Sequence, residues 1–443
     1  MANTYLTRTP SSTGNATKWT LSMWVKRSKL GVQTPIISTV QSSPSNTYDE
    51  MYFNTSDKFQ FSTVYNNTQK AIRTTRVFRD VNAWYHIQFV YDTTNSTDTD
   101  HAILYINGVR ETSFEDTTLL ASGANDWESA WNKASNPMRI GYQSTNTASY
   151  FDGSMSHIHF ANNQTYAATV FGETDATTGE WKIKTSPSFT PGTNGFTILK
   201  DGNTITDQST NSNNFSLGGG TLTKTEDCPD NVFATWNPLV NNAGEMMRLT
   251  NGNTSCQSNA AEGNSWKLAV STLGMTSGKY YWEAKLVNIN NNNYHGVMGS
   301  NVFQANASLP MNATGFTGWN NSDGGEILKD GDNTANNYGT LADNDILGIA
   351  CDVDNYTISV YKNGSALVSN YALSTTSRDI LFPCSLAYNT NNTGIPQSSY
   401  NFGNGYFGST QISSAGTNAS GNGIFEYNVP AGFTALSTKG LNL

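Results

Sequence analysis

The fold of this chain is decided by the stretch Ile103-Leu104-Tyr105-Ile106-Asn107-Gly108-Val109, an alternating strand that runs directly into Asn-Gly. Much later in the chain, the stretch Ile358-Ser359-Val360-Tyr361-Lys362-Asn363-Gly364 repeats the same order of residue types. Asn-Gly tolerates the positive φ angles of a type I′ turn, whose twist matches that of a two-stranded β-ribbon. Each stretch therefore predicts a tight β-hairpin.

Strands rich in aromatic side chains precede both predicted hairpins, at residues 84–91 and 280–286. A further stretch, residues 20–26, alternates in the way that is typical of a half-buried strand. Helical periodicity is not seen over any length, and we expect one short helical turn at most, around residues 166–171. We therefore predict an all-β chain with two jelly-roll-like β-sandwiches in series.

The strands fall into two groups that are separated by a stretch of different composition. We predict a first sandwich over residues 1–165, an ordered connector with short strands over residues 166–240, and a second sandwich over residues 241–443. In the connector, short apolar pieces alternate with polar spacers such as Gly218-Gly219-Gly220. The tail at residues 424–434 is predicted to be a closing edge strand that Pro430 ends.

The composition favours a folded protein with few charges. Charged residues make up 13% of the chain, against roughly 25% in an average soluble domain. The 51 aromatic residues (10 Trp, 21 Tyr and 20 Phe) are enough to fill two cores. The net charge of −9, with Lys and Arg scattered, argues against nucleic acid or an anionic membrane as a partner.

Sequence signals for secretion, membrane insertion and disulfides are weak. The start of the chain lacks the apolar core of a signal peptide, and no apolar run is long enough for a transmembrane helix. The spacing of Cys228, Cys256, Cys351 and Cys384 matches no zinc or redox motif. We expect free thiols in a protein that folds in a reducing cytoplasm, with Cys351 and Cys384 in the core.

No metal or cofactor site is predicted. His157 and His159 are two apart on an expected strand and would share a face, but no third ligand lies near them in sequence. Residues 330–336 hint at a calcium loop, yet Ala335 replaces the central glycine and Leu341 the bidentate glutamate of that motif. A looser surface calcium stays open at this point.

We do not expect an enzyme. A glycosidase needs two carboxylates about 5–9.5 Å apart, one of them protonated. The nearest candidates are Glu111 with Glu115, which follow a hairpin in a polar stretch, and Glu173 with Asp175, which lie in the connector. No G-x-S-x-G nucleophile motif occurs.

Aromatic residues in polar loops are better candidates, and they point to sugar binding. Sugars present flat apolar faces ringed by hydroxyl groups, which suits an aromatic ring with amides beside it. Trp127 and Trp131 lie in one polar loop, and Trp319, Asn320 and Tyr338 flank another. The alternative is that these rings fold back to cap a sandwich or pack at a subunit interface.

Two groups of residues resemble known families. A lectin-like group resembles the laminin-G/concanavalin A-like family, and a later group resembles a SPRY domain. The first consists of Trp84-Tyr85-His86, Leu104-Tyr105-Ile106-Asn107-Gly108 and Phe151-Asp152-Gly153. The second consists of Gly278-Lys279-Tyr280-Tyr281-Trp282-Glu283, Ile346-Leu347-Gly348-Ile349-Ala350 and Tyr361-Lys362-Asn363-Gly364.

The order of these groups and the residues at their joints are similar to a family of lectin-like plus SPRY proteins that is common in marine bacteriophages. The joints carry Phe171-Gly172-Glu173-Thr174-Asp175, Gly179-Glu180-Trp181-Lys182 and Pro430-Ala431-Gly432-Phe433-Thr434. The resemblance implies a virion protein, such as a tail fibre, spike or head-surface appendage, that is assembled in the host cytoplasm. It implies that the partners are other virion proteins and a host-surface glycan. It also implies a homo-oligomer, and the analogy with fibres suggests that this oligomer is a trimer. A purely architectural decoration protein and a polysaccharide depolymerase are the alternatives.

Overall fold

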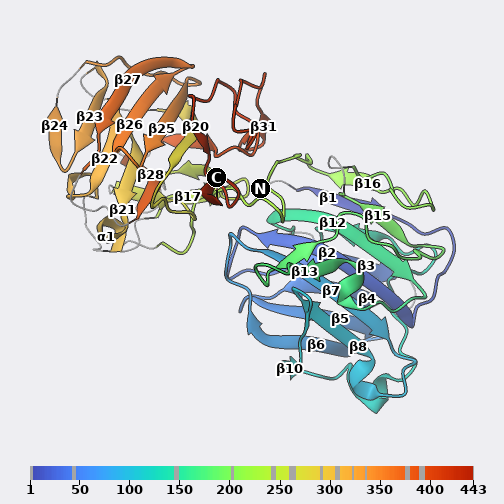
Figure 1. Ribbon diagram of the computed structural model, residues 1–443. Helices are drawn as coiled ribbons and strands as arrows, with labels where there is room; N and C mark the ends of the chain where they lie inside the picture. Colours follow the sequence, from blue (N-terminus) through green and yellow to red (C-terminus); the bar gives the residue numbers. More distant parts are fainter. Residues whose placement is uncertain are drawn as a thin grey trace. The chain divides into compact units, whose positions relative to one another are not determined.

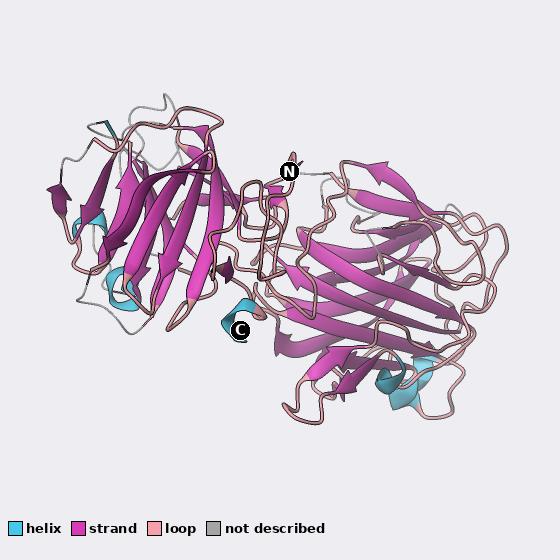
Figure 2. Ribbon diagram, turned by 45° about the horizontal axis from the view of Figure 1, so that its top comes forward, coloured by secondary structure: helices cyan, strands magenta, loops and turns pink. Residues whose placement is uncertain are grey.

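The computed structural model describes residues 3–41, 46–143, 149–200, 204–240, 246–258, 266–289, 293–304, 310–321, 324–334, 337–374, 380–388 and 395–442. The chain divides into two compact units, Met1–Lys224 and Thr225–Leu443 (Figure 1). Both units are jelly-roll-like β-sandwiches, which confirms the predicted all-β fold (Figure 2). No helix in the described ranges is both long and apolar enough to cross a membrane.

The first unit contains two large sheets and a small hairpin. The larger sheet has the strand order β10-β6-β5-β4-β3-β11-β1-β16, the smaller β15-β12-β2-β7-β8-β9, and β13 pairs with β14. The elements are β1 (Tyr5–Arg8), β2 (Lys18–Arg27), β3 (Thr34–Gln41), β4 (Thr47–Phe53), β5 (Lys58–Tyr65), β6 (Thr68–Val77), β7 (Trp84–Asp92), η1 (Asp98–Asp100), β8 (Ala102–Ile106), β9 (Val109–Arg110), β10 (Phe114–Asp116), η2 (Ser122–Ala124), β11 (Met138–Ile140), β12 (Gly153–Asn162), η3 (Ala168–Val170), β13 (Gly172–Thr174), β14 (Trp181–Ile183), β15 (Phe196–Ile198) and β16 (Ser216–Gly219).

The second unit repeats this two-sheet plan. One sheet has the order β17-β18-β29-β20-β25-β26-β27 with β32 added beside β20, and the other β19-β28-β21-β22-β23-β24. The elements are β17 (Arg248–Thr250), β18 (Ser255–Gln257), β19 (Trp266–Val270), β20 (Lys279–Asn288), β21 (Asn293–Gly299), α1 (Ser300–Gln304), η5 (Pro310–Asn312), β22 (Phe316–Asn320), β23 (Glu326–Lys329), β24 (Asp332–Thr334), β25 (Ile346–Asp352), β26 (Thr357–Lys362), β27 (Ser365–Ala372), β28 (Leu381–Tyr388), β29 (Gln397–Asn401), β30 (Tyr406–Phe407), β31 (Thr410–Gln411), β32 (Thr434–Ala435) and η7 (Gly440–Asn442).

The core of the first unit follows from the register of its larger sheet. Because side chains alternate between the two faces of a strand, cross-strand partners share a face. One such inward row runs over six strands and is buried along its whole length, with each large side chain worth about 1.5–3 kcal/mol of burial. The row consists of Leu6, Ile140, Ile37, Met51, Phe61 and Ile72.

Both Asn-Gly hairpins are confirmed. Ile106 pairs with Val109 across Asn107 (φ 48°) and Gly108 (φ 78°). In the second unit Asn363 (φ 47°) and Gly364 (φ 80°) occupy the same two turn positions between β26 and β27. Positive φ at both central residues defines the type I′ turn.

Residues 166–224 belong to the first compact unit by their contacts. The helical turn expected there is confirmed as η3. The segment also adds β15 to one sheet beside β12, and β16 to the other beside β1. The division of the chain at residues 165 and 240 stays a prediction.

Two local expectations are wrong. The regular strand expected at His157 and His159 is interrupted, because the β12 register breaks between Ser156 and His159 and His157 adopts φ 48°, although the two rings stay close, with centroids 6.2 Å apart. The closing strand is reduced to β32. The backbone ahead of it is held instead by Glu283, whose carboxylate accepts the N–H groups of Glu426 and Tyr427, both at 2.9 Å.

The expected thiols are confirmed. All four cysteines are free. Cys351 and Cys384 lie in the cores of the second unit, and so does Cys256. Burial in apolar surroundings raises the pKa of Cys256 to about 12, which keeps it a thiol.

Candidate carbohydrate-binding surface

Trp131 is a core residue, which corrects its placement among surface binding residues. Its ring is 0% exposed and packs edge-on against Phe160, with centroids 6.2 Å apart. Its backbone N–H donates to the carboxylate of Asp49 at 2.6 Å, and Ser129 donates to the same oxygen. Burial raises the pKa of Asp49. Because a ring must expose one face to stack on a sugar, Trp131 offers no platform in this conformation.

Trp319 and Asn320 are also buried, and they point to opposite faces of β22. Trp319 (0% exposed) lies in the core of the second unit, whereas Asn320 (1% exposed) donates to the Glu326 carboxylate at 3.2 Å. The asparagine-rich sequence suggested a loop here, but these residues end a paired strand, and successive side chains of a strand alternate. Neither is presented to a ligand, which corrects both assignments.

Tyr338 is half-buried and packs against the core of the second unit. Its backbone N–H donates to the carbonyl of Gly325 at 2.9 Å, which fixes the chain at this point. Its role in binding stays a prediction.

Trp127 is half-buried, as Tyr338 is, and it packs against the edge of the core of the first unit. Its half-buried indole lies beside the ring of Tyr65, with centroids 6.3 Å apart and planes at 84°. The Lys70 ammonium lies over the indole, 5.7 Å from its centroid, at a distance where a cation is attracted to an aromatic face. Tyr65 is 48% exposed. We call these three residues the Trp127 patch.

Several hydrogen bonds hold Trp127 in place. Its carbonyl accepts the hydroxyl of Tyr91 at 2.8 Å and that of Thr93 at 2.9 Å. Its indole N–H donates to Thr63 at 3.3 Å. The ring is therefore fixed against the edge of the core, and it is not free to fold over the sheet.

Tyr65 was not singled out from the sequence, although a signal was present. It ends β5 and runs into Asn66 (φ 46°) and Asn67 (φ 67°), a two-residue turn of the same kind as the two Asn-Gly turns. Both asparagines are exposed. The turn thus presents amide groups next to the aromatic patch, which is the combination that hydroxyl-rich ligands require.

The carboxylates considered for hydrolysis are occupied by basic partners. Glu111 accepts from Arg76 at 2.8 Å. Glu115 pairs with Lys58 and Arg73, and the hydrogen bond from Lys58 lowers its pKa. The bond from Lys182 likewise holds the pKa of Asp175 below its usual range. A glycosidase acid requires the opposite shift.

Metal-ligating side chains are scattered. Within the described ranges, no three His, Cys, Asp or Glu residues gather where they could hold an ion. Of the segment considered for calcium, residues 335 and 336 lie outside those ranges. Asp330 instead accepts the N–H of Gly315 at 2.7 Å.

Comparison with known proteins gives similarities in fold. No curated protein matches the sequence. Solved structures that resemble parts of the chain include a heptameric SAP-like pentraxin from Limulus polyphemus (13% identity, 37% of this chain and 72% of that one, TM-score 0.28). A second is the SPRY domain of human HERC1 (18% identity, 33% of this chain and 87% of that one, TM-score 0.28). A third is the TRIM65 PSpry domain (13% identity, 36% of this chain and 90% of that one, TM-score 0.27). By sequence, residues 2–171 match the family described as the concanavalin A-like lectin/glucanases superfamily.

Proposed function

We propose that this chain is a non-enzymatic bacteriophage virion protein that attaches to glycans of the host surface through the Trp127 patch. The observation that carries the proposal is the exposed ring of Tyr65 beside the fixed indole of Trp127, with Lys70 over that indole. The lectin-type match over residues 2–171 supports a binding role for the unit that holds the patch.

A patch of this size implies weak binding by one copy. Two aromatic faces and a few amides bury little area, and small sites of this kind gain affinity mainly by repetition. A homo-oligomer on a particle would place many patches in reach of a surface that repeats one sugar unit. The fibre analogy makes a trimer the expected form.

The proposal excludes hydrolysis as the activity. It is supported by the ion pairs of Glu115 and Asp175, whose basic partners lower the pKa of these two carboxyl groups, and by the ion pair that Glu111 makes with Arg76. A general acid for glycoside cleavage has to hold its proton near neutral pH.

The test uses the labelled full chain on a panel of immobilised bacterial lipopolysaccharides and capsular polysaccharides. We expect saturable binding to a subset, reduced at least tenfold by Trp127→Ala and by Tyr65→Ala. Tyr105→Ala removes another half-buried ring of the same unit and is the control that should bind normally.

Circular dichroism shows whether each variant is folded before it is scored. Wild-type protein that binds no polysaccharide as the assembled oligomer would favour the architectural alternative. Shortening of the polysaccharides during the assay would instead support the alternative that the protein is a depolymerase.

A further inference from the structure

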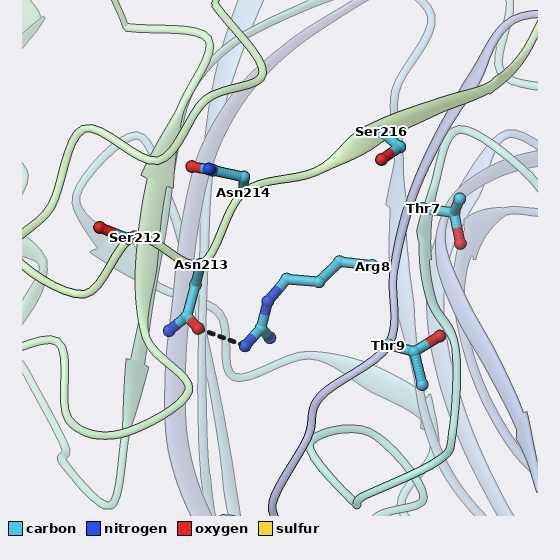
Figure 3. Close-up of a pocket in the computed structure, with 7 residues that line it drawn as sticks. All are labelled: Thr7, Arg8, Thr9, Ser212, Asn213, Asn214 and Ser216. Carbon is cyan, nitrogen blue, oxygen red and sulfur yellow. Dashed lines mark hydrogen bonds between the residues drawn. The ribbon is translucent and has the colours of Figure 1, made fainter.

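A second feature of the first unit is a polar pocket beside the end of β1. Its volume is about 400 Å³. Its walls carry hydroxyl and amide groups and one guanidinium, that of Arg8 (Figure 3). Figure 3 shows the Arg8 side chain extended across the pocket toward Asn213. The lining residues are Thr7, Arg8, Thr9, Ser212, Asn213, Asn214 and Ser216.

The β-strand register explains why a guanidinium lies here. Leu6 points into the core, so Arg8, two positions later, shares its face at the point where the strand ends. β1 pairs with β16, and Thr7 lies opposite Ser216. The pairing brings residues 212–216 beside the end of β1, which closes one wall of the pocket.

Arg8 has neutral partners only. It donates to the side-chain oxygen of Asn213, to that of Asn194 at 3.5 Å, and to the sulfur of Met138 at 3.5 Å. No carboxylate lies within ion-pairing distance of it among the residues that the structure describes. Burial lowers the pKa of Arg8, and the more distant charge of Asp207 opposes that shift. The side chain is thus a half-buried cation with no anion bonded directly to it among the described residues.

Asp207 lies behind the pocket wall, where its carboxylate is used by hydrogen bonds within the protein. It is buried and accepts the N–H of Thr197 at 2.8 Å, the N–H and hydroxyl of Ser209 at 2.8 Å, and the N–H of Asn213 at 2.7 Å. These four bonds fold residues 207–214 into a fixed turn. They place Asn213 against Arg8. Because Nη2 donates to Asn213 and Asn194 and Nη1 donates to Met138, the Nε hydrogen and the second Nη1 hydrogen are the donors that a ligand would meet.

We propose that this pocket binds the carboxylate of an acidic saccharide, a uronic acid or a related sugar acid. The Arg8 guanidinium takes the carboxylate, and the polar groups of the pocket wall are available to the sugar ring. Arg is suited to this role because it stays charged and makes strong charge-assisted hydrogen bonds to carboxylate oxygens, and because partial burial weakens competition from water. The saccharide class rests on the proposed function, but the residues are different from those of the Trp127 patch.

The test is calorimetric titration of the full chain with trigalacturonate, and with maltotriose as the uncharged sugar. We expect saturable binding of trigalacturonate alone, weakened at least tenfold by Arg8→Gln. Arg8→Lys keeps the charge but loses the planar set of donors, and should bind with intermediate affinity. Arg110→Gln removes one guanidinium from an exposed site of the same unit and should leave binding unchanged.

A second variant covers the case in which Arg8→Gln does not fold. Ser216 is exposed, so Ser216→Trp fills the pocket mouth while keeping Arg8. This variant should also lose trigalacturonate. Binding that survives Ser216→Trp, or that weakens equally in Arg110→Gln, overturns the proposal.

Two further titrations identify the chemistry that is recognised. Sodium sulfate that competes with trigalacturonate at equal concentration would show that any oxyanion suffices, and it would overturn the assignment to a sugar acid. Trp127→Ala separates the two proposals. Loss of trigalacturonate binding in Trp127→Ala but not in Arg8→Gln would overturn the pocket and keep the patch, whereas the reverse result would support the pocket alone.

Discussion

The indole N–H of Trp181 donates to Nδ1 of His86 at 3.0 Å. The imidazole also stacks on Trp24, with centroids 5.0 Å apart, and its Nε2 lies 2.9 Å from the hydroxyl of Ser22. Because Nδ1 accepts the bond, the proton of the neutral ring is on Nε2 and faces Ser22. The contact fastens the β13–β14 hairpin to the smaller sheet of the first unit.

Acid should destabilise the first unit through His86. Burial lowers its pKa from 6.5 to about 3. Between about pH 3 and pH 6.5 the imidazole is therefore protonated in the unfolded chain and neutral in the folded unit. The free energy of unfolding therefore falls as the pH drops below 6.5. Calorimetric melting of His86→Gln should show a shallower dependence on pH. His159, whose pKa is also lowered to about 3, keeps part of the slope. An unchanged slope would contradict a neutral His86.

Glu283 should make the second unit behave in the opposite way. Burial raises its pKa to about 7, so the folded unit binds more protons than the unfolded chain between the two pKa values. Its contribution to stability is full below about pH 4.5 and is lost as the pH rises toward 7. Glu283→Gln should flatten this dependence. It should also cost about 1–3 kcal/mol at acid pH, because one of the two N–H groups then faces an NH₂ group.

The measurement for Glu283 is denaturant unfolding of the second unit at several pH values. Glu426→Gln is the control, because that side chain is partly exposed and bonds Ser413, and only its backbone meets Glu283. A Glu283→Gln variant that keeps the full pH dependence would show that another group titrates.

Gly108→Ala should destabilise the first unit by more than the strain of its positive φ angle, because the new side chain also meets a ring. A Cβ at Gly108 would lie 2.4 Å from the ring of Trp181, and φ is +78°. Gly179 has a similar φ of +75° with open space around it, so Gly179→Ala reports the backbone strain by itself. We expect about 1 kcal/mol for Gly179→Ala and clearly more for Gly108→Ala. Equal losses would mean that Trp181 moves aside without cost.

Native thiol labelling should modify Cys228 at most. Cys256, Cys351 and Cys384 are buried, whereas Cys228 is partly exposed. Titration with an aromatic disulfide reagent should therefore count no more than one thiol in the native protein and four in denaturant. Fast reaction of a second thiol would show that one of the cores opens.

The sequence was sufficient for the fold because its signals are local. Asn107-Gly108 and Asn363-Gly364 carry their own turn geometry, and alternation marks the strands on either side of them. The candidate site was predicted less well. Trp131 and Trp319 have polar sequence neighbours, as Trp127 does. Only the packing of the whole sandwich decides which of the three rings is buried.

The Arg8 pocket shows a different limit of sequence reasoning. Arg8 and Asn213 are brought together by the pairing of β1 with β16, two strands far apart in the chain. Neither residue belongs to a motif. Their meeting depends on a sheet topology that no short pattern contains.

The buried carboxylate of Asp49 has a consequence for how the Trp127 patch would meet a ligand. It anchors Ser129 and Trp131, just after Trp127 in the same loop. The loop therefore lost its conformational entropy when the protein folded, and a sugar does not have to order it. Ligand binding should show a small entropic penalty and a fast on-rate, set by diffusion rather than by rearrangement of the loop.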